Sequence, residues 1–488
     1  MKNILSVILL SLFTTVLMAQ LNRSTPPEAG KAPKINIGEY QKFTLKNGLQ
    51  VFVVEDHKLP IVSYSLTLNI DPIYEGKAAG YTSLAGELMR SGTSNRKKTE
   101  IDEAIDFIGA TLNTYSKGIY ASSLTKHNQT LLELMADVLM NPTFPQEELD
   151  KSLKQMETAI QAEKNEPSSI AKNIASVLRY GKEDPYGEIV TEESLNNINI
   201  DLLKNYHKNY FRPNVAYLVI VGDINIKEAK KQAKKYFGTW KRADVPKQQY
   251  SNWPSYDTPK VAIANRDGSN QSVILVTHTV PLTPGHPDAI KATVMNQILG
   301  GGSFNTRLFQ NLREDKAYTY GSYSRLSTDK RIGYFSASAQ VRTSVTDSAL
   351  NEIIYEINRM QKELVSDNDL QLIKNMMTGS FSRSLEDPQT IANFALNIER
   401  YNLPSDYYHT YLEQVAAVTA EDVKQMAIKY LKPEQAIIIA VGQADKIEES
   451  MRSFSPEGKV TRYDYYGNEV KGTIEVTDKT AIEINHDN

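Results

Sequence analysis

Cysteines and closely spaced histidine pairs, two common sources of metal ligands, do not occur in this 488-residue chain. The absence of cysteine excludes thiolate metal sites, disulfides and cysteine nucleophiles. No two of the seven histidines stand three or four residues apart, the spacing that places both imidazoles on one face of a helix. The histidines are His57, His127, His207, His278, His286, His409 and His486. The spacing of the histidines therefore encodes no local metal site, and a site assembled from residues distant along the chain is left open.

The overall charge gives no sign of a nucleic-acid-binding protein. The formal net charge is -3, so there is no basic surplus to attract phosphate. The hydrophobic fraction of 41% and the charged fraction of 23% are ordinary for globular proteins. A chain of this length is expected to form two to four domains with a core large enough to fold without disulfides.

The first nineteen residues have the pattern of a secretory signal peptide. Lys2 gives a positive start, residues 4–18 are almost wholly apolar, and Ala19 is a small residue at the expected cleavage point. The apolar stretch is too short for a comfortable membrane span. We therefore expect cleavage after Ala19 and an exported, periplasmic protein without a membrane anchor.

An internal repeat divides the chain into two similar halves. Residues 198–223 and 418–443 align without gaps at an offset of 220 residues. Each copy begins with a helix cap, reaches a Tyr-x-Arg/Lys-Pro sequence and continues as an apolar stretch ending at Val-Gly. The repeat predicts an amphipathic helix that leads into a buried strand, once per half. His207 lies in the first of these helices, where a structural role is expected.

Composition shifts suggest the domain boundaries. A Pro-rich stretch at 246–259 separates a first domain, 37–245, from a second domain, 260–455. Residues 20–36 are expected to form a flexible leader, and the tail at 456–488 has no evident role.

Strands and helices are expected to occur in separate groups. An Asn47-Gly48 turn predicts a hairpin within residues 45–54, and residues 61–70 alternate as a half-buried strand. Helices are predicted within 99–107 and 129–140, and a further hairpin turn is predicted at Gly467. Grouped strands and helices indicate an α+β architecture.

Short motifs in both halves resemble the M16 peptidase family of pitrilysin/insulinase type. Their order and spacing are demanding, and with the repeat the resemblance covers residues 38–455. The motifs are Leu45-x-Asn47-Gly48-Leu49, Gly80 to Gly92-Thr93, Asn113, Gly300-Gly301-Gly302-x-x-x-x-Arg307-Leu308-Phe309 and Leu312-Arg313-Glu314. The resemblance implies two homologous α/β-sandwich domains, each an antiparallel sheet with helices on one face, that form half of a clamshell.

The resemblance also implies that the zinc site of the family is lost. Active members carry His-x-x-Glu-His on the helix that ends at Gly-Thr, with two zinc ligands, a general base and a distal Glu ligand on a later helix. Here Ser83 and Glu87 stand at the His positions, Gly86 at the base position and Ala159 at the distal position. One possible ligand of three remains, so we expect Glu87 to be a solvated helix residue and the chain to hold no metal or other cofactor.

A pair of residues in the second half matches the substrate-gripping residues of the family. Arg313 and Tyr320 stand seven residues apart. By resemblance, Arg313 would bind a substrate carbonyl and Tyr320 would donate a hydrogen bond to the developing oxyanion, in trans. The alternative is a helix-end Arg and a packed strand Tyr, in which case Phe would be tolerated at position 320.

Two further segments could contact substrate. Asn113, Thr114 and Tyr115 fall where the family presents an edge strand, to which a peptide can add through main-chain hydrogen bonds. An ordinary buried strand is the alternative. Gly301 and Gly302 could form a close turn at a cavity wall or a helix C-cap.

The resemblance favours a non-catalytic, substrate-binding subunit of a heterodimeric zinc metallopeptidase that degrades peptides in the periplasm. Its partner would be an M16 homologue with an intact His-x-x-Glu-His motif, which would carry the zinc. Metalloendopeptidase activity is expected only with that partner. The alternatives are an inactive peptide-binding or scaffold protein unconnected with proteolysis, and an independent metallopeptidase with unconventional ligands.

Overall fold

The computed structural model describes residues 37–302 and 304–470. The predicted signal peptide and leader lie outside the described residues, as does the end of the tail. Within the described ranges, no helix has both the length and the apolar character needed to cross a membrane.

The first half forms one six-stranded sheet with the strand order β1-β2-β6-β3-β5-β4. Its strands are β1 (Gln41–Thr44), β2 (Gln50–Glu55), β3 (Ile61–Leu68), β4 (Thr111–Tyr115), β5 (Gly118–Leu124) and β6 (Ala216–Gly222). Its helices are α2 (Tyr81–Leu88), α3 (Lys98–Phe107), α4 (Asn128–Met140), α5 (Gln146–Glu163), α6 (Pro167–Tyr180), α7 (Glu192–Asn196), α8 (Ile200–Tyr210) and α9 (Ile226–Phe237).

The second half repeats this plan with the strand order β12-β7-β11-β8-β10-β9. Its strands are β7 (Lys260–Asn265), β8 (Gln271–Val280), β9 (Thr319–Ser327), β10 (Gly333–Arg342), β11 (Ile437–Gly442) and β12 (Val460–Arg462). Its helices are α10 (Ala289–Leu299), α11 (Arg307–Phe309), α12 (Thr346–Lys362), α13 (Asp367–Ser384), α14 (Pro388–Tyr401), α15 (Tyr411–Ala417), α16 (Ala420–Tyr430) and α17 (Ala444–Met451). A π-helical turn, Gln310–Asp315, follows α11.

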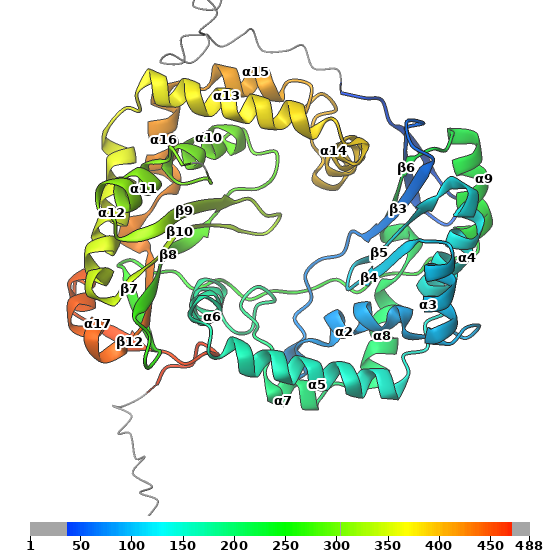
Figure 1. The fold of residues 1–488 in the computed structure, drawn as a ribbon, viewed down its shortest axis with the longest axis horizontal. Coiled ribbons are helices and arrows are strands. Elements are labelled where there is room, and N and C mark those ends of the chain that lie inside the picture. The colour runs from blue at the N-terminus through cyan, green and yellow to red at the C-terminus, as the bar shows by residue number, and fades with distance from the viewer. Residues whose placement is uncertain (1–36, 303, 471–488) are drawn as a thin grey trace, which may run out of the picture. The chain divides into compact units, whose positions relative to one another are not determined.

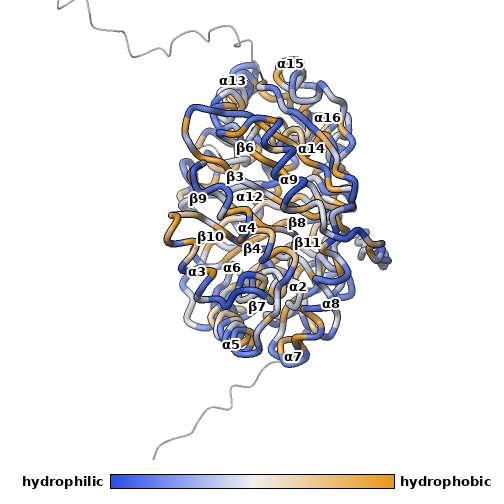
Figure 2. Tube along the Cα trace, turned by 90° about the vertical axis from the view of Figure 1, so that its right-hand side faces the viewer, coloured by the Kyte–Doolittle hydropathy of each residue, from blue (hydrophilic) through white to orange (hydrophobic). Residues whose placement is uncertain are grey.

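Local sequence signals account for several of these elements. The predicted hairpin joins β1 to β2 through Gly48, whose φ of 94° favours glycine. The two repeat helices are α8 and α16, capped by the side chains of Asn199 and Thr419. Figure 2 shows hydrophobic and hydrophilic residues interspersed along the described chain, as expected where helices have one apolar side and one polar side.

The predicted α+β class is confirmed, but the sheets are mixed rather than purely antiparallel. β6 runs parallel to β2, and β11 runs parallel to β7. Each of these strands follows a long helical crossover, which brings the chain back in the direction of the earlier strand. The other long pairings, such as β3 with β5 and β8 with β10, are antiparallel.

Strands β6 and β11 are buried on both faces, although the helices of their own half cover only one. The second cover comes from the other half. Helix α6 packs on β8 and β11 of the second sheet, and helix α14 packs on β2 and β6 of the first (Figure 1). The two helices are equivalent, since each has 14 residues, a Pro in the first turn and an acidic N-cap.

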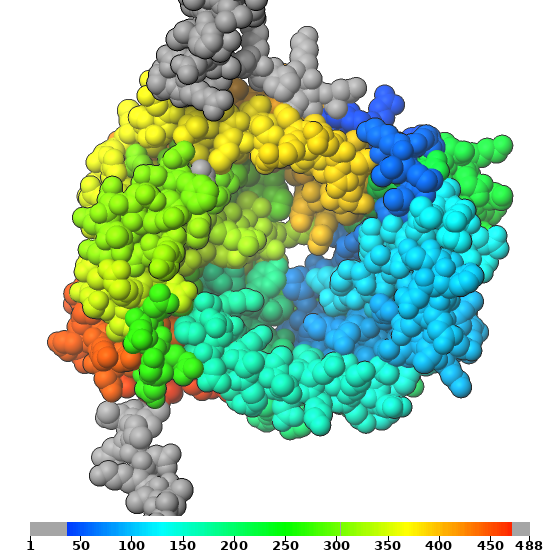
Figure 3. Space-filling model, viewed as in Figure 1, coloured from blue at the N-terminus to red at the C-terminus, as the bar shows by residue number. Residues whose placement is uncertain are grey.

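The contact of α14 with the first sheet is a separate apolar cluster. Ala392 and Ala395 of α14 pack against Phe52, Val54 and Val219. Small residues let the helix lie close to the sheet. Lys42 of β1 forms an ion pair with Glu399 at the edge of this contact, with 2.6 Å between Nζ and Oε2. Figure 3 shows the surface where α14 meets the N-terminal strands.

A buried ion pair also joins the halves. Arg331 donates two hydrogen bonds to Asp184, of 3.1 and 2.7 Å, and only 1% of the Asp184 side chain is exposed. The guanidinium of Arg331 lies 3.4 Å from the ring centroid of Tyr250, and Trp253 donates to Asp184 over 3.3 Å. The Pro-rich stretch between the halves therefore packs on this ion pair.

Part of the tail, whose role the sequence did not indicate, belongs to the fold. Strand β12 pairs in parallel with β7, and the predicted turn at Gly467 follows it. The Tyr465 hydroxyl donates to Glu163 of α5 over 2.8 Å, and the Tyr466 hydroxyl donates to Glu192 of α7. The tail thus connects the edge of the second sheet to helices of the first half.

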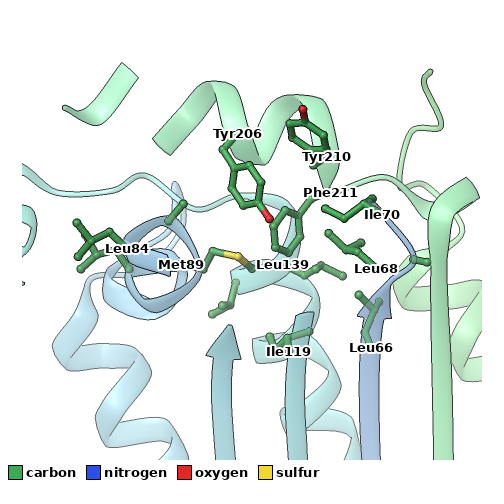
Figure 4. Packing of buried hydrophobic residues seen from close by; sticks show 14 of the residues in the cluster. Leu66, Leu68, Ile70, Leu84, Met89, Ile119, Leu139, Tyr206, Tyr210 and Phe211 are labelled. Carbon is green, nitrogen blue, oxygen red and sulfur yellow. The ribbon is translucent and has the colours of Figure 1, made fainter. Parts of the chain in front are cut away.

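Helix α2 carries three of the four expected zinc-site positions. The chain at its N-terminal end is fixed by hydrogen bonds to two carboxylates, those of Glu75 and Glu188. Glu75 accepts hydrogen bonds from the backbone N–H groups of Gly80 and Thr82, and Glu188 accepts them from Glu75 and Gly76. Burial raises the pKa of Glu75, and it raises the pKa of Glu188 to about 7. Helix α2 packs against α8, where the rings of Tyr81 and Tyr206 lie edge to face with their centroids 6.0 Å apart. Leu84 of α2 and Tyr206 belong to the same buried cluster (Figure 4).

Removing Arg331 should destabilise the whole chain. The Arg331→Met variant leaves Asp184 as a buried charge without its ion-pair partner, and such a loss destabilises a protein by about 3–5 kcal/mol. Chemical denaturation of the mature chain measures the effect. Lys429→Met is the control, because its pair with Asp288 is more exposed and should contribute about 1 kcal/mol or less. Equal losses for the two variants would contradict a special role for Arg331.

Stability should also depend on the protonation of Glu188. Its pKa in the fold is raised to about 7, so its contribution is full below the ordinary value of 4.5 and is lost as the pH rises through about 7. We expect Glu188→Gln to flatten the decline in melting temperature over this range. The exposed Glu183→Gln control should follow the wild-type slope. Parallel curves for Glu188→Gln and wild type would exclude this role.

Candidate functional site

The expected zinc-site positions lie on two neighbouring helices. Ser83 and Glu87 are exposed on α2, and Ala159 is exposed on α5. The Glu87 carboxylate accepts a hydrogen bond of 2.9 Å from the hydroxyl of Ser152, two turns before Ala159 on α5. Sequence comparison of the motif positions did not identify Ser152, because its contact with Glu87 arises from the packing of the two helices. Glu87 therefore has a protein partner as well as solvent.

Gly86 stands where no side chain fits. A Cβ atom at this position would lie 2.1 Å from the backbone nitrogen of Ser116 and 2.2 Å from the carbonyl carbon of Tyr115. The backbone after β4 thus occupies the space in which the general base of the motif would begin. Side-chain movement cannot relieve this contact, because both atoms belong to the main chain.

The residues at these positions do not fit a zinc ion. Zinc is held by about three protein ligands, and here one carboxylate, a hydroxyl and a methyl group occupy the three positions. Across the described ranges, no group of three or more His, Asp and Glu side chains is arranged to hold a metal. His278 is buried and His207 is partly buried. Each forms a hydrogen bond with a backbone carbonyl, and desolvation lowers the pKa of each to about 4. The expected structural role of His207 is confirmed.

Strand β4, which contains Asn113, Thr114 and Tyr115, is the edge strand of the first sheet. Its outer side is partly occupied. Arg90 donates to the Leu112 carbonyl over 2.9 Å, and the Thr114 hydroxyl donates to the Glu87 carbonyl over 3.2 Å. Tyr115 is 54% exposed. Any added peptide strand would have to share this edge with the end of α2.

Tyr320 lies at a β-bulge on β9, the edge strand of the second sheet. Thr319 pairs with Val341 and Ser322 with Ala339, so Tyr320 and Gly321 together oppose Gln340. The hydroxyl of Thr319 donates to the Gln340 carbonyl over 2.7 Å and accepts from the Gly321 N–H. A bulge of this kind redirects a side chain, and Tyr320 is 88% exposed.

An open groove of about 520 Å³ lies beside Tyr320. It lies where α6 leaves the second sheet uncovered, and no residue of its lining carries a formal charge. Tyr323, which is 47% exposed, forms part of its wall, and Ser168 of α6 closes one side. Groove residues from both halves include Ser168, Val273, Tyr320, Gly321, Tyr323 and Ser338.

Arg313 lies in the π-helical turn and contacts its neighbours. Its guanidinium is 4.7 Å from the ring centroid of Phe309, and its Nε is 3.5 Å from the Glu314 carboxylate. The Phe309 ring in turn lies 6.4 Å from that of Tyr323. Phe309 stood out in the sequence only as part of the family motif, and Tyr323 did not stand out at all. Arg313 is thus linked to the groove strand through an aromatic contact.

The glycines at 300–302 end helix α10 and lie along β9. The Gly300 carbonyl accepts a hydrogen bond from the Ser324 N–H over 2.8 Å, so this part of the β9 edge is already paired. At Gly301 a Cβ would meet the Gln297 side chain at 2.5 Å, whereas Gly302 has open space and a φ of 106°. This geometry is that of a helix end at the sheet edge.

Models of one family match both halves of the chain. Residues 50–182 match "Insulinase (Peptidase family M16)", and residues 197–377 match "Peptidase M16 inactive domain". Together the two matches cover more than half of the chain.

Similar proteins include named peptidases and a named non-peptidase. The "Uncharacterized zinc protease YmxG" of Bacillus subtilis is 25% identical over 355 residues, which are 71% of this chain and 84% of that protein. The "Non-peptidase homolog YmxG" of Helicobacter pylori is 20% identical over 379 residues, or 76% and 87%. The solved peptidase M16 inactive domain from Pseudomonas fluorescens has the same fold, with a TM-score of 0.75, 23% identity and coverage of 83% of this chain and 98% of that one.

Both halves match the family, and the helix of its zinc motif has neither the ligands nor the space for the base. The chain therefore belongs to the M16 peptidase family, as a member with a degenerate zinc-binding motif.

Proposed function

We propose that this protein is the non-catalytic, substrate-binding subunit of a heterodimeric M16 peptidase that degrades peptides. Its partner is an M16 homologue that carries an intact His-x-x-Glu-His motif and the zinc ion. The observation that carries the proposal is the contrast between the two halves. The first half has lost the motif and the space for its base, while the second half presents Tyr320 at an exposed bulge.

The groove beside Tyr320 supports a role in peptide binding. It has about 520 Å³, which accommodates one or two residues of an extended chain, and its lining is uncharged. The hydroxyl of Tyr320 has no hydrogen-bond partner within the described part of the chain, so it is free to donate to a substrate oxygen. Arg313 would need to leave Glu314 and Phe309 to reach a substrate carbonyl.

The contacts of Arg313 with Phe309 and Glu314 favour a second candidate function, in which Arg313 does not bind substrate. An arginine that already stacks on an aromatic ring and lies beside a carboxylate contributes to packing without any substrate. In that case the protein is a peptide-binding or scaffold protein unconnected with proteolysis. The two functions differ in whether Tyr320 affects cleavage by the assembled pair.

We also propose that the protein works in the periplasm. The proposal rests on the signal peptide pattern of residues 1–19. The periplasmic protease PqqL of Escherichia coli shares the fold, with a TM-score of 0.70 and 14% identity over 86% of this chain and 49% of that one. Detection of the mature chain beginning at Gln20 in a periplasmic extract would test it.

Replacing Tyr320 by Phe should slow cleavage by the assembled pair. Loss of one oxyanion donor typically lowers the rate about a hundredfold. The assay mixes the mature chain with its zinc-bearing homologue and measures hydrolysis of a fluorogenic peptide. Each chain alone should cleave poorly.

The same change at Tyr355 is the matched control, because Tyr355 is 53% exposed on α12 and lies outside the groove. Neither substitution should alter folding, since both side chains are exposed. If Tyr320→Phe and Tyr355→Phe cleave equally fast, Tyr320 takes no part in catalysis.

Restoring the motif residues should not restore a zinc site. In the Ser83→His, Gly86→Glu, Glu87→His variant, the side chain at 86 would collide with backbone. We expect Gly86→Ala alone to lower the free energy of unfolding by about 1–3 kcal/mol. Gly379→Ala is the control, because its Cβ has open space on α13 and should stabilise by about 0.5–1 kcal/mol. Stoichiometric zinc in the triple variant would refute the steric argument.

A further inference from the structure

Tyr320 faces the groove because strand β9 contains an extra residue. Ser322 pairs with Ala339, so a regular strand would place Tyr320 opposite Val341. Val341 is fully buried in the core of the second half, and residues that oppose each other in a sheet lie on the same face. The bulge instead places Tyr320 opposite the exposed Gln340. The direction of Tyr320 therefore depends on the bulge being maintained.

The hydroxyl of Thr319 links the two sides of this bulge. Its oxygen lies 2.7 Å from the Gln340 carbonyl oxygen on β10 and 2.9 Å from the Gly321 carbonyl oxygen on its own strand, and its single proton is donated to one of them at a time. It also accepts a hydrogen bond of 3.1 Å from the Gly321 N–H. A bulge leaves backbone groups without the partner that a regular strand provides. One side-chain hydroxyl thus replaces part of the missing backbone pairing.

The chain on either side of the bulge is fixed by separate contacts. Before it, Ala317 has a φ of 51°, and its carbonyl accepts a hydrogen bond of 3.0 Å from Arg342. After it, the Tyr323 ring lies over Gly321, where a Cβ atom would be 2.7 Å from the Tyr323 hydroxyl oxygen. Thr319 lies between these two contacts, where its hydroxyl bonds the backbone of the bulge itself.

We propose that Thr319 is a positioning residue, whose hydroxyl holds the β9 bulge and so directs Tyr320 toward the groove. It acts through the backbone rather than by contact with the reacting atoms. The inference rests on the function proposed for Tyr320, the donation of a hydrogen bond to a developing oxyanion. Because that oxyanion exists only in the transition state, loss of the Thr319 hydroxyl lowers kcat and leaves KM nearly unchanged.

Hydrogen exchange of the mature chain alone tests the first step, the support of the bulge. Thr319→Ala removes the hydroxyl, so the Gly321 N–H loses its acceptor and should exchange about tenfold faster. Thr319→Ser keeps the hydroxyl and should exchange like the wild type. Unchanged exchange in Thr319→Ala would overturn the proposal, whatever the cleavage assay gives.

Cleavage of a fluorogenic peptide by the chain and its zinc-bearing homologue tests the second step, the action through Tyr320. Thr319→Ala should lower kcat about tenfold, whereas Thr319→Ser should keep it within about twofold. In the Tyr320→Phe background, Thr319→Ala should cause no further loss, because the group that it positions is already absent. Thr343→Ala is the control and should leave cleavage unchanged. Its hydroxyl also donates to a backbone carbonyl, over 3.4 Å, but it lies outside the groove.

The outcomes separate this proposal from the function proposed for Tyr320. If Tyr320→Phe slows cleavage and Thr319→Ala does not, Tyr320 acts on the substrate but Thr319 has no positioning role. Equal losses from Thr319→Ala with and without the Tyr320 hydroxyl would also contradict the proposal, because Thr319 would then act independently of Tyr320. If Tyr320→Phe cleaves as fast as the wild type, the function proposed for Tyr320 fails, and the positioning role fails with it.

Discussion

The fold depends on a reciprocal exchange of helices between its two halves. Each six-stranded sheet has strands that are apolar on both faces, and the helices of one half can cover only one of these faces. Helix α6 of the first half covers the second sheet, and helix α14 of the second half covers the first. Neither half can therefore bury its own sheet completely, and the duplicated sequence folds as an interdependent pair.

Polar contacts also join the two halves, in addition to the apolar packing of α6 and α14. Arg331 and Asp184 pair across the halves beneath the aromatic residues of the Pro-rich connection, and Tyr465 reaches α5 from the tail. The position of α6 has a further consequence. Because α6 covers β8 and β11 but leaves β9 and β10 open, a neutral groove forms beside Tyr320. The candidate substrate site is thus a product of how the halves interlock.

The two halves have diverged around the same plan. In the first, backbone from the end of β4 lies against Gly86 and fills the space of a catalytic base. In the second, the corresponding edge strand is bulged, so a tyrosine projects into solvent. The loss in one half is steric as well as chemical, which is why replacing side chains alone is not expected to reverse it. In the second half, the exposure of Tyr320 depends on the bulge in β9 rather than on contact with one neighbouring side chain.

The sequence by itself determined the features that depend on local interactions. Helix caps at Asn199 and Thr419, the Asn47-Gly48 turn and the apolar repeat strands indicated the two-fold α+β plan, and the motif positions on α2 indicated the missing ligands. These signals are readable because each depends on residues within a few positions of one another.

Only the tertiary structure decided which helix covers which sheet, how parallel and antiparallel strands combine in each sheet, and where the backbone excludes or exposes a side chain. The contact of Gly86 with Ser116 and the bulge at Tyr320 opposite Gln340 each join segments that are separated along the chain. Their physical cause is packing and burial, and the distances that set both exist only after the chain has folded.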